Sequence, residues 1–84
     1  MNKELNLHID FSKNLTEKQQ NDFWDEIVGL MESYDLRASG GHDSTYIDWV
    51  IDCRYSALDK GEIIDTIGDF LNEKEDLILN YKIE

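Results

Sequence analysis

The chain has 84 residues, of which 40 % are hydrophobic, so it is long enough for one small domain with a modest core and too apolar for a disordered chain. Its formal net charge is −11, from 19 acidic and 8 basic residues, so its surface should repel naked nucleic acid and attract basic partners. Cys53, the only cysteine, excludes an internal disulfide, and no signal peptide or membrane-spanning apolar run is evident. We therefore expect one cytoplasmic domain, residues 1–84, with no membrane partner.

The first predicted elements are a strand and a helix. Leu5, Leu7, Ile9 and Phe11 alternate with polar residues, which indicates a strand with one buried side. A capping box of Thr16 and Gln19 then opens a helix that runs to about Tyr34. Apolar residues recur in this helix every three or four positions and form one wide stripe: Phe23, Trp24, Ile27, Val28, Leu30, Met31 and Tyr34. We expect Gly29 to allow a close approach of the helix to the sheet.

The strongest strand signal lies in residues 46–53, which are rich in β-branched and aromatic residues. The two-residue period places Ile47, Trp49, Ile51 and Cys53 on a buried side, and Tyr46, Asp48, Val50 and Asp52 on the other side. Gly40, Gly41, Asp43 and Ser44 indicate a turn before this strand. Residues 36–39 are then its short hairpin partner.

The last third of the chain repeats the helix and strand pattern. Asp59 and Glu62 form a second capping box, and a shorter apolar stripe follows: Ile63, Ile64, Ile67, Phe70 and Leu71. A charged link of residues 73–76 leads to a strand over residues 77–83. Strict alternation places Leu77, Leu79, Tyr81 and Ile83 on one side of that strand, and Ile78, Asn80 and Lys82 on the other.

These elements predict an α+β fold, a ferredoxin-like βαββαβ sandwich with right-handed crossovers. Its two helices cover one face of a four-stranded antiparallel sheet, in which the first and third strands lie side by side in the middle. The uncovered face then carries His8, Asp10, Tyr46, Asp48, Val50, Asp52, Ile78, Asn80 and Lys82.

The chain from Leu5 to its end resembles the YggL-type family of small bacterial proteins associated with the large ribosomal subunit. The resemblance lies in an alternating first strand and in four motifs that follow it: LTEKQQNDFWDEIV, LRASGG with a following acidic residue, TYIDWVIDC, and SALDKGEIIDTIGDFLN. Its most specific part is the turn of small residues that leads into the strand with Trp49. The resemblance implies a non-enzymatic protein that docks on a ribosomal or other translation component.

Two clusters of residues suggest chemistry. His8, Asp10, Asp48 and Asp52 are ligand types that suit a divalent ion, but a solvated polar face is the simpler interpretation. His42, Asp43 and Ser44 have the residue types of a catalytic triad, which is recognised by spatial roles rather than adjacency, and all three are ordinary turn residues. We expect Trp24 and Trp49 to lie in the core. The sequence predicts no metal, no cofactor and no catalysis.

The acidic composition leaves two functions open. One is docking on the large ribosomal subunit or on another protein or ribonucleoprotein with a basic surface. The other is an acidic nucleic-acid mimic or inhibitor that binds the basic surface of a nucleic-acid-handling protein. In both cases we expect a monomer or weak homodimer. The predicted partner-binding residues are Tyr46, Asp48, Val50, Asp52, Asp10, Asp22, Asp25 and Glu26.

Overall fold

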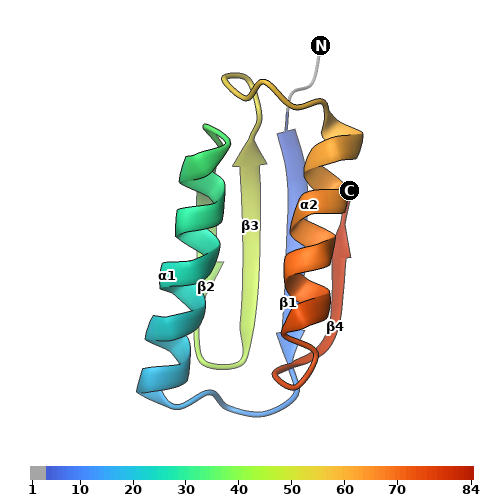
Figure 1. Ribbon diagram of the computed structural model, residues 1–84. Coiled ribbons are helices and arrows are strands. Elements are labelled where there is room, and N and C mark those ends of the chain that lie inside the picture. The colour runs from blue at the N-terminus through green and yellow to red at the C-terminus, as the bar shows by residue number, and fades with distance from the viewer. Residues whose placement is uncertain (1–3) are drawn as a thin grey trace.

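The helices and strands occur in the predicted order. Segments with apolar residues every three or four positions form the helices, and segments in which apolar and polar residues alternate form strands. The computed structural model describes residues 4–84. In chain order its elements are β1 (Glu4–Phe11), α1 (Glu17–Ser33), β2 (Arg37–His42), β3 (Tyr46–Asp52), α2 (Lys60–Glu73) and β4 (Ile78–Ile83) (Figure 1).

Both helices begin at the predicted capping boxes. The Thr16 hydroxyl accepts a hydrogen bond from the Gln19 N–H at 3.1 Å, and the Gln19 side chain accepts one from the Thr16 N–H at 3.0 Å. In α2 the Asp59 carboxylate accepts from the Glu62 N–H at 2.8 Å, and Glu62 accepts from the Asp59 N–H at 3.4 Å. Each pair satisfies two backbone donors that the first turn leaves without an intrahelical acceptor.

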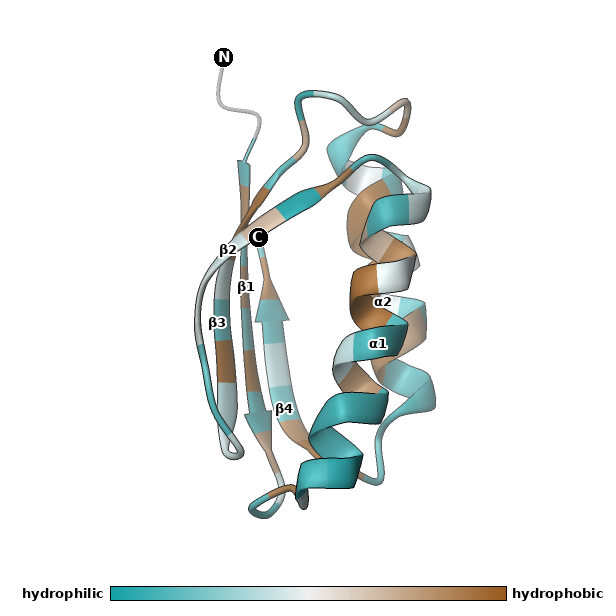
Figure 2. Cartoon of the chain, turned by 90° about the vertical axis from the view of Figure 1, so that its left-hand side faces the viewer, coloured by the Kyte–Doolittle hydropathy of each residue, from teal (hydrophilic) through white to brown (hydrophobic). Residues whose placement is uncertain are grey.

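The four strands form one antiparallel sheet in the order β2-β3-β1-β4, with β1 and β3 in the middle. The two helices lie side by side over one face of this sheet, and in residues 4–84 no helix covers the other face (Figure 1). Figure 2 shows the resulting two layers from the side. The predicted ferredoxin-like βαββαβ sandwich is confirmed.

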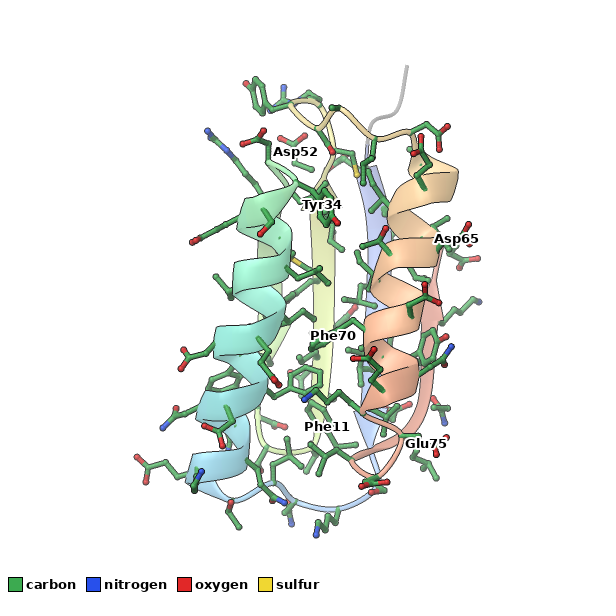
Figure 3. All side chains as sticks on the ribbon, viewed as in Figure 1. Phe11, Tyr34, Asp52, Asp65, Phe70 and Glu75 are labelled. Atoms are coloured by element: carbon green, nitrogen blue, oxygen red, sulfur yellow. The ribbon has the colours of Figure 1, made fainter. Side chains whose placement is uncertain are left out.

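The core lies between the sheet and the helices. The four alternating residues of β1 are buried, as are Ile47, Trp49, Ile51 and Cys53 of the β3 segment. The helices contribute the buried side chains Phe23, Ile27, Met31, Ile63, Ile67 and Leu71. Phe70 lies between the two helices (Figure 3), where its ring centroid is 5.6 Å from that of Phe23. Full burial of each large apolar side chain stabilises the fold by about 1.5–3 kcal/mol.

The buried stripe of α1 is narrower than predicted. Phe23, Ile27 and Met31 are buried, but Val28 is 43 % exposed and Tyr34 36 % exposed. The prediction for Gly29 is wrong, because this residue is exposed and a Cβ added there would meet nothing within 4 Å. The glycine faces solvent on the outer side of the helix, so its small size brings α1 no closer to the sheet.

The two central glycines lie in a strand and not in the predicted turn. Gly40 pairs with Trp49 and Gly41 with Asp48 within the β2–β3 ladder. Gly40 has a φ of 139°, and a Cβ at this position would overlap the carbonyl oxygen of Asp48. Glycine is therefore required by a close approach of two strands. The turn itself is centred on Asp43, whose carboxylate accepts hydrogen bonds from the backbone of Thr45 and Tyr46.

The predicted faces of the last strand are partly wrong. Asn80 pairs with Asp10 on the open face, where both were predicted, but Ile78 pairs with Phe11, which leaves Leu79 as an extra residue in a β-bulge. Ile78 therefore packs half-buried against the core, and Leu79 is 69 % exposed. Strict alternation fails here because the inserted residue places Ile78 on the core side of the sheet.

Candidate functional site

The open face of the sheet brings together five of the predicted partner-binding residues. Tyr46, Asp48, Val50 and Asp52 share the β3 side opposite the buried Trp49, and Asp10 lies across from Tyr46 in the β1–β3 register. Val50 is 37 % exposed, which makes it one of the more accessible large apolar side chains. The face is of mixed charge, because Arg37 of β2 and Lys82 of β4 pair with residues of the same side.

The other three predicted residues lie in a different layer. Asp22, Asp25 and Glu26 belong to α1, on the far side of the sheet (Figure 2). Two of them already have partners, since Asp22 pairs with Lys18 at 2.9 Å and Glu26 with Lys74 at 2.6 Å. The predicted set is therefore divided between two opposite surfaces of the domain.

The possible metal ligands are only partly brought together. His8 Nε2 lies 3.0 Å from the Asp10 carboxylate, and His8 Nδ1 lies 4.0 Å from that of Asp48. Asp52 is four residues further along β3, where it pairs with Glu4 in the register. Within residues 4–84, no three His, Cys, Asp or Glu side chains are arranged to hold a metal ion.

Asp52 instead anchors a cluster of charges at the end of the sheet. Its carboxylate accepts hydrogen bonds from the Arg54 guanidinium, the shortest at 2.8 Å, and from the Arg54 backbone N–H. These bonds, with a smaller effect from Arg37, hold the pKa of Asp52 below its usual range. Both guanidiniums also lie over the Tyr55 ring, at 5.0 Å for Arg37 and 5.5 Å for Arg54. The chain thus places its two arginines around one exposed tyrosine.

The three triad-like residues have separate partners in the hairpin. His42 Nδ1 accepts a hydrogen bond from the Trp49 indole N–H at 3.3 Å, and Ser44 donates to the Asn14 side chain at 3.2 Å. Asp43 accepts from the Thr45 hydroxyl and backbone N–H, both at 2.6 Å, which lowers the pKa of its carboxyl. Each side chain therefore shapes the turn or the strand next to it.

The helical face is the most acidic surface that the structure shows. Its exposed carboxylates are Glu17, Asp22, Asp25, Glu26 and Glu32 on α1, and Glu62, Asp65, Asp69 and Glu73 on α2. Within the two helices, only Lys18 and Lys60 oppose these nine carboxylates. Figure 3 shows Asp65 pointing outward from α2, away from α1.

A groove between α1 and β2 was missed by sequence reasoning. Its volume is about 440 Å³, and its apolar lining comes from Val28, Met31, Leu36 and Trp49. His42 also lines it, and its ring centroid is 4.5 Å from that of Trp24 and 5.8 Å from that of Trp49. Trp49 is buried as predicted, and Trp24 is half-buried. The sequence signal for this groove was the run of small residues over 38–41, because these side chains are too small to fill the space between β2 and α1.

Comparison with known protein families, with curated proteins and with solved structures found no match. The resemblance to the YggL-type family therefore stays a prediction. Among residues 4–84, no helix combines the length and the apolar character needed to cross a membrane.

Proposed function

We propose that this protein is a non-enzymatic, YggL-like docking protein that binds a basic surface of the large ribosomal subunit or of another translation component. The observation that carries the proposal is the charge of the helical face, where Lys18 and Lys60 within the helices and Lys74 at the end of α2 oppose nine exposed carboxylates. Carboxylates arranged in this way attract basic protein surfaces over a distance and repel exposed phosphates. The family resemblance supplies the ribosomal partner, and the charge supplies the mode of binding.

The thickness of the domain supports a choice between its two surfaces. Its shortest dimension is 20 Å, whereas charges in water are screened over about 8 Å at physiological ionic strength. Carboxylates on the helices therefore contribute little to a partner that contacts the open sheet face. Because the open face also carries Arg37 and Lys82, we assign the basic partner to the helical face.

The second candidate, an acidic mimic of nucleic acid, is favoured by the regular row of carboxylates on α2. Glu62, Asp65, Asp69 and Glu73 are three or four residues apart, so they share one side of the helix. The helical rise of about 1.5 Å per residue separates neighbours by about 4.5–6 Å along the axis. A straight, exposed row of this kind suits a basic groove that ordinarily holds a phosphate backbone.

Sedimentation with purified large ribosomal subunits through a sucrose cushion tests the first proposal. We expect wild-type protein to co-sediment at low salt and to be released as NaCl is raised. The double variant Asp65→Asn/Asp69→Asn should reduce the bound fraction several-fold. Its matched control, Asp10→Asn/Asp48→Asn, removes the same charge from the open face and should bind within twofold of wild type. Equal losses in both variants, or no co-sedimentation at low salt, would contradict the proposal.

The mimic makes a different prediction in affinity capture from lysate. Proteins held by wild type should then be eluted by added duplex DNA or by RNA, because the competitor occupies the same basic groove. The Asp65→Asn/Asp69→Asn variant should retain less of these proteins. Capture that resists nucleic-acid competition would argue against a mimic.

A further inference from the structure

The groove beside β2 exists because that strand carries almost no side-chain volume toward the helices. Ala38 pairs with Ile51 and Gly40 with Trp49, so both face the helix layer. Gly40 cannot carry a side chain, since a Cβ would overlap the Asp48 carbonyl oxygen. The space of about 440 Å³ next to them is bounded by Val28 and Met31 of α1. The groove therefore results from the small residues of β2 and from its backbone geometry at Gly40.

The outer edge of β2 also offers backbone hydrogen-bonding groups. In residues 4–84, β2 has β3 as its neighbour on one side and no strand on the other. The Asp43 N–H donates to the Tyr46 carbonyl at 3.0 Å, and hydrogen-bonded pairs alternate along an antiparallel ladder. This alternation turns the backbone groups of His42 and Ala38 outward. Ala38 and His42 also line the groove, so the outward-facing backbone groups of β2 lie next to the apolar side chains of the groove.

The floor of the groove is held in a fixed orientation. The Trp49 indole donates its hydrogen bond to His42 Nδ1, and the Trp24 and Trp49 rings both contact the imidazole edge to face. This bond places the proton of the neutral imidazole on Nε2. A side chain that enters the groove therefore meets a preformed aromatic wall, which lowers the entropic cost of binding.

We propose that this groove binds an extended segment of a partner protein, which adds to the sheet as a fifth strand beside β2. The segment carries a branched apolar side chain that enters the groove, flanked by lysine or arginine. Main-chain hydrogen bonds to the β2 edge supply affinity, and the groove selects the side chain that alternates toward α1. The surface shares Glu32 with the helical face but lies apart from Asp65 and Asp69 of α2, whose replacement tests the first proposal, so the two experiments probe different residues.

The basic residues of the segment follow from the charge around the groove. Glu32 lines both the groove and an adjoining hollow of about 220 Å³, where Asp35 joins it. Arg37 also lines both spaces, but its guanidinium lies over Tyr55 and acts on Asp52. The rim therefore presents carboxylates to an incoming chain, and a lysine or arginine beside the apolar side chain can pair with them.

A second copy of this chain fits the groove poorly. Each copy has a net charge of −11, so two copies repel one another. In addition, β2 of a second copy would bring only Ala38, Gly40 and His42 toward the space, and the first two leave it unfilled. An extended segment with a larger side chain and opposite charge satisfies both conditions.

The capped peptide Lys-Val-Leu-Val-Lys is a direct probe, titrated into the full chain and followed by amide and indole NMR shifts. We expect shifts over residues 38–42, Val28 and the Trp49 indole. The same peptide with N-methyl groups on alternate backbone nitrogens keeps its charge but loses strand pairing, and should bind at least tenfold more weakly. Equal affinity of the two peptides, or shifts concentrated at the α2 carboxylates, would overturn the proposal.

Two protein variants complete the test. Val28→Lys and Val50→Lys each add one ammonium group at an exposed valine, 43 % and 37 % exposed respectively, but only Val28 lines the groove. Because the added charge repels the peptide lysines, Val28→Lys should weaken peptide binding at least tenfold and Val50→Lys less than twofold, with folding of both checked by thermal melting. Similar binding by both variants overturns the proposal. So does peptide-free, concentration-dependent dimerisation with shifts at β2, which would identify a second copy as the occupant.

Discussion

The two edge strands of the sheet, β2 and β4, pack differently against the helices. At the β4 edge, Ile78, Tyr81 and Ile83 pack half-buried against the core, and the Tyr81 hydroxyl donates to Asn72 of α2 at 3.2 Å. At the β2 edge, all six residues are exposed and the strand leaves a groove beneath α1. The two edges therefore differ in the side-chain volume of the edge strand. Large side chains on β4 fill the space beneath α2, and small residues on β2 leave a groove beneath α1.

The residues that line the space beside each edge strand also differ. A hollow of about 420 Å³ also lies beside β4, but Asp65, Asp69 and Asn72 contribute much of its lining. The β2 groove has a similar volume, but Val28, Met31, Leu36 and Trp49 give it an apolar part beside Glu32, Arg37, Ser39 and His42. Volume alone thus does not distinguish a binding groove from a solvated hollow, whereas the chemistry of the lining does.

The largest expected effect comes from Trp49→Asp, which removes the floor of the β2 edge. An unpaired carboxylate would be placed where the native side chain is only 7 % exposed, and we expect a loss of about 4 kcal/mol or more, enough to unfold the domain. Asp48→Asn on the opposite face should change stability by less than about 0.5 kcal/mol. Circular dichroism with urea unfolding measures both. Similar small effects would show that the assigned faces of β3 are wrong.

Gly40→Ala should be the next most damaging change. The φ of 139° and the overlap with the Asp48 carbonyl predict a loss of about 2–3 kcal/mol. Gly41→Ala is the matched control, because its Cβ would meet only the Tyr46 hydroxyl at an ordinary 3.5 Å. It should cost less than about 1 kcal/mol. If the two alanine variants unfold at the same urea concentration, the close approach of β2 and β3 at Gly40 does not constrain the fold.

Ala38→Leu tests whether the groove beside β2 results only from the small side chains of that strand. The added side chain faces the groove, so it should bury apolar surface and raise the free energy of unfolding by about 0.5–1 kcal/mol. Truncation at the other edge should act in the opposite direction, with a loss of about 2 kcal/mol for Tyr81→Ala. Thermal and urea unfolding decide between gain and loss. Destabilisation by Ala38→Leu would mean that the space is too small for a branched side chain.

The smallest effect is a pH dependence in the hairpin that joins β2 to β3. Because hydrogen bonds from Thr45 lower the pKa of the Asp43 carboxyl from its ordinary value of 3.8, the ionised form stabilises the folded state. This stabilisation is complete above the ordinary pKa and is lost as the pH falls through the folded-state pKa. Asp43→Asn should therefore melt slightly below wild type at pH 6, and the difference should shrink at pH 2. A constant difference would rule out the carboxylate as its source.

Most of the fold could be predicted because its signals are local. The alternation in β1 and β3 and the two capping boxes act over two to four residues, and the structure confirms each of them. Gly40 was assigned to the wrong element because glycine serves tight turns and close strand contacts alike. The face of Ile78 was wrong because a bulge depends on pairing with β1, which the sequence of β4 alone does not encode.

The candidate surfaces were predicted less completely, because they depend on pairing between distant segments. The two-residue period correctly placed Asp48 and Asp52 on one face, but only the register shows that His8 lies beside Asp48 and away from Asp52. Helix periodicity located Asp22 and Asp25 on an exposed side, yet it did not show that the sheet separates them from Tyr46. The β2 groove was missed although residues 38–41 are all small, because this run was interpreted as the end of a short strand and a turn.

The bulge at Leu79 has a consequence for how copies of this chain meet. A sheet with two accessible edges invites head-to-tail stacking, in which β2 of one molecule pairs with β4 of the next and the chain of molecules never closes. Such a ladder needs an uninterrupted strand, and the bulge limits the regular part of β4 to residues 80–83. The irregular residue thus shortens the edge that β4 can offer to β2 of a neighbouring molecule.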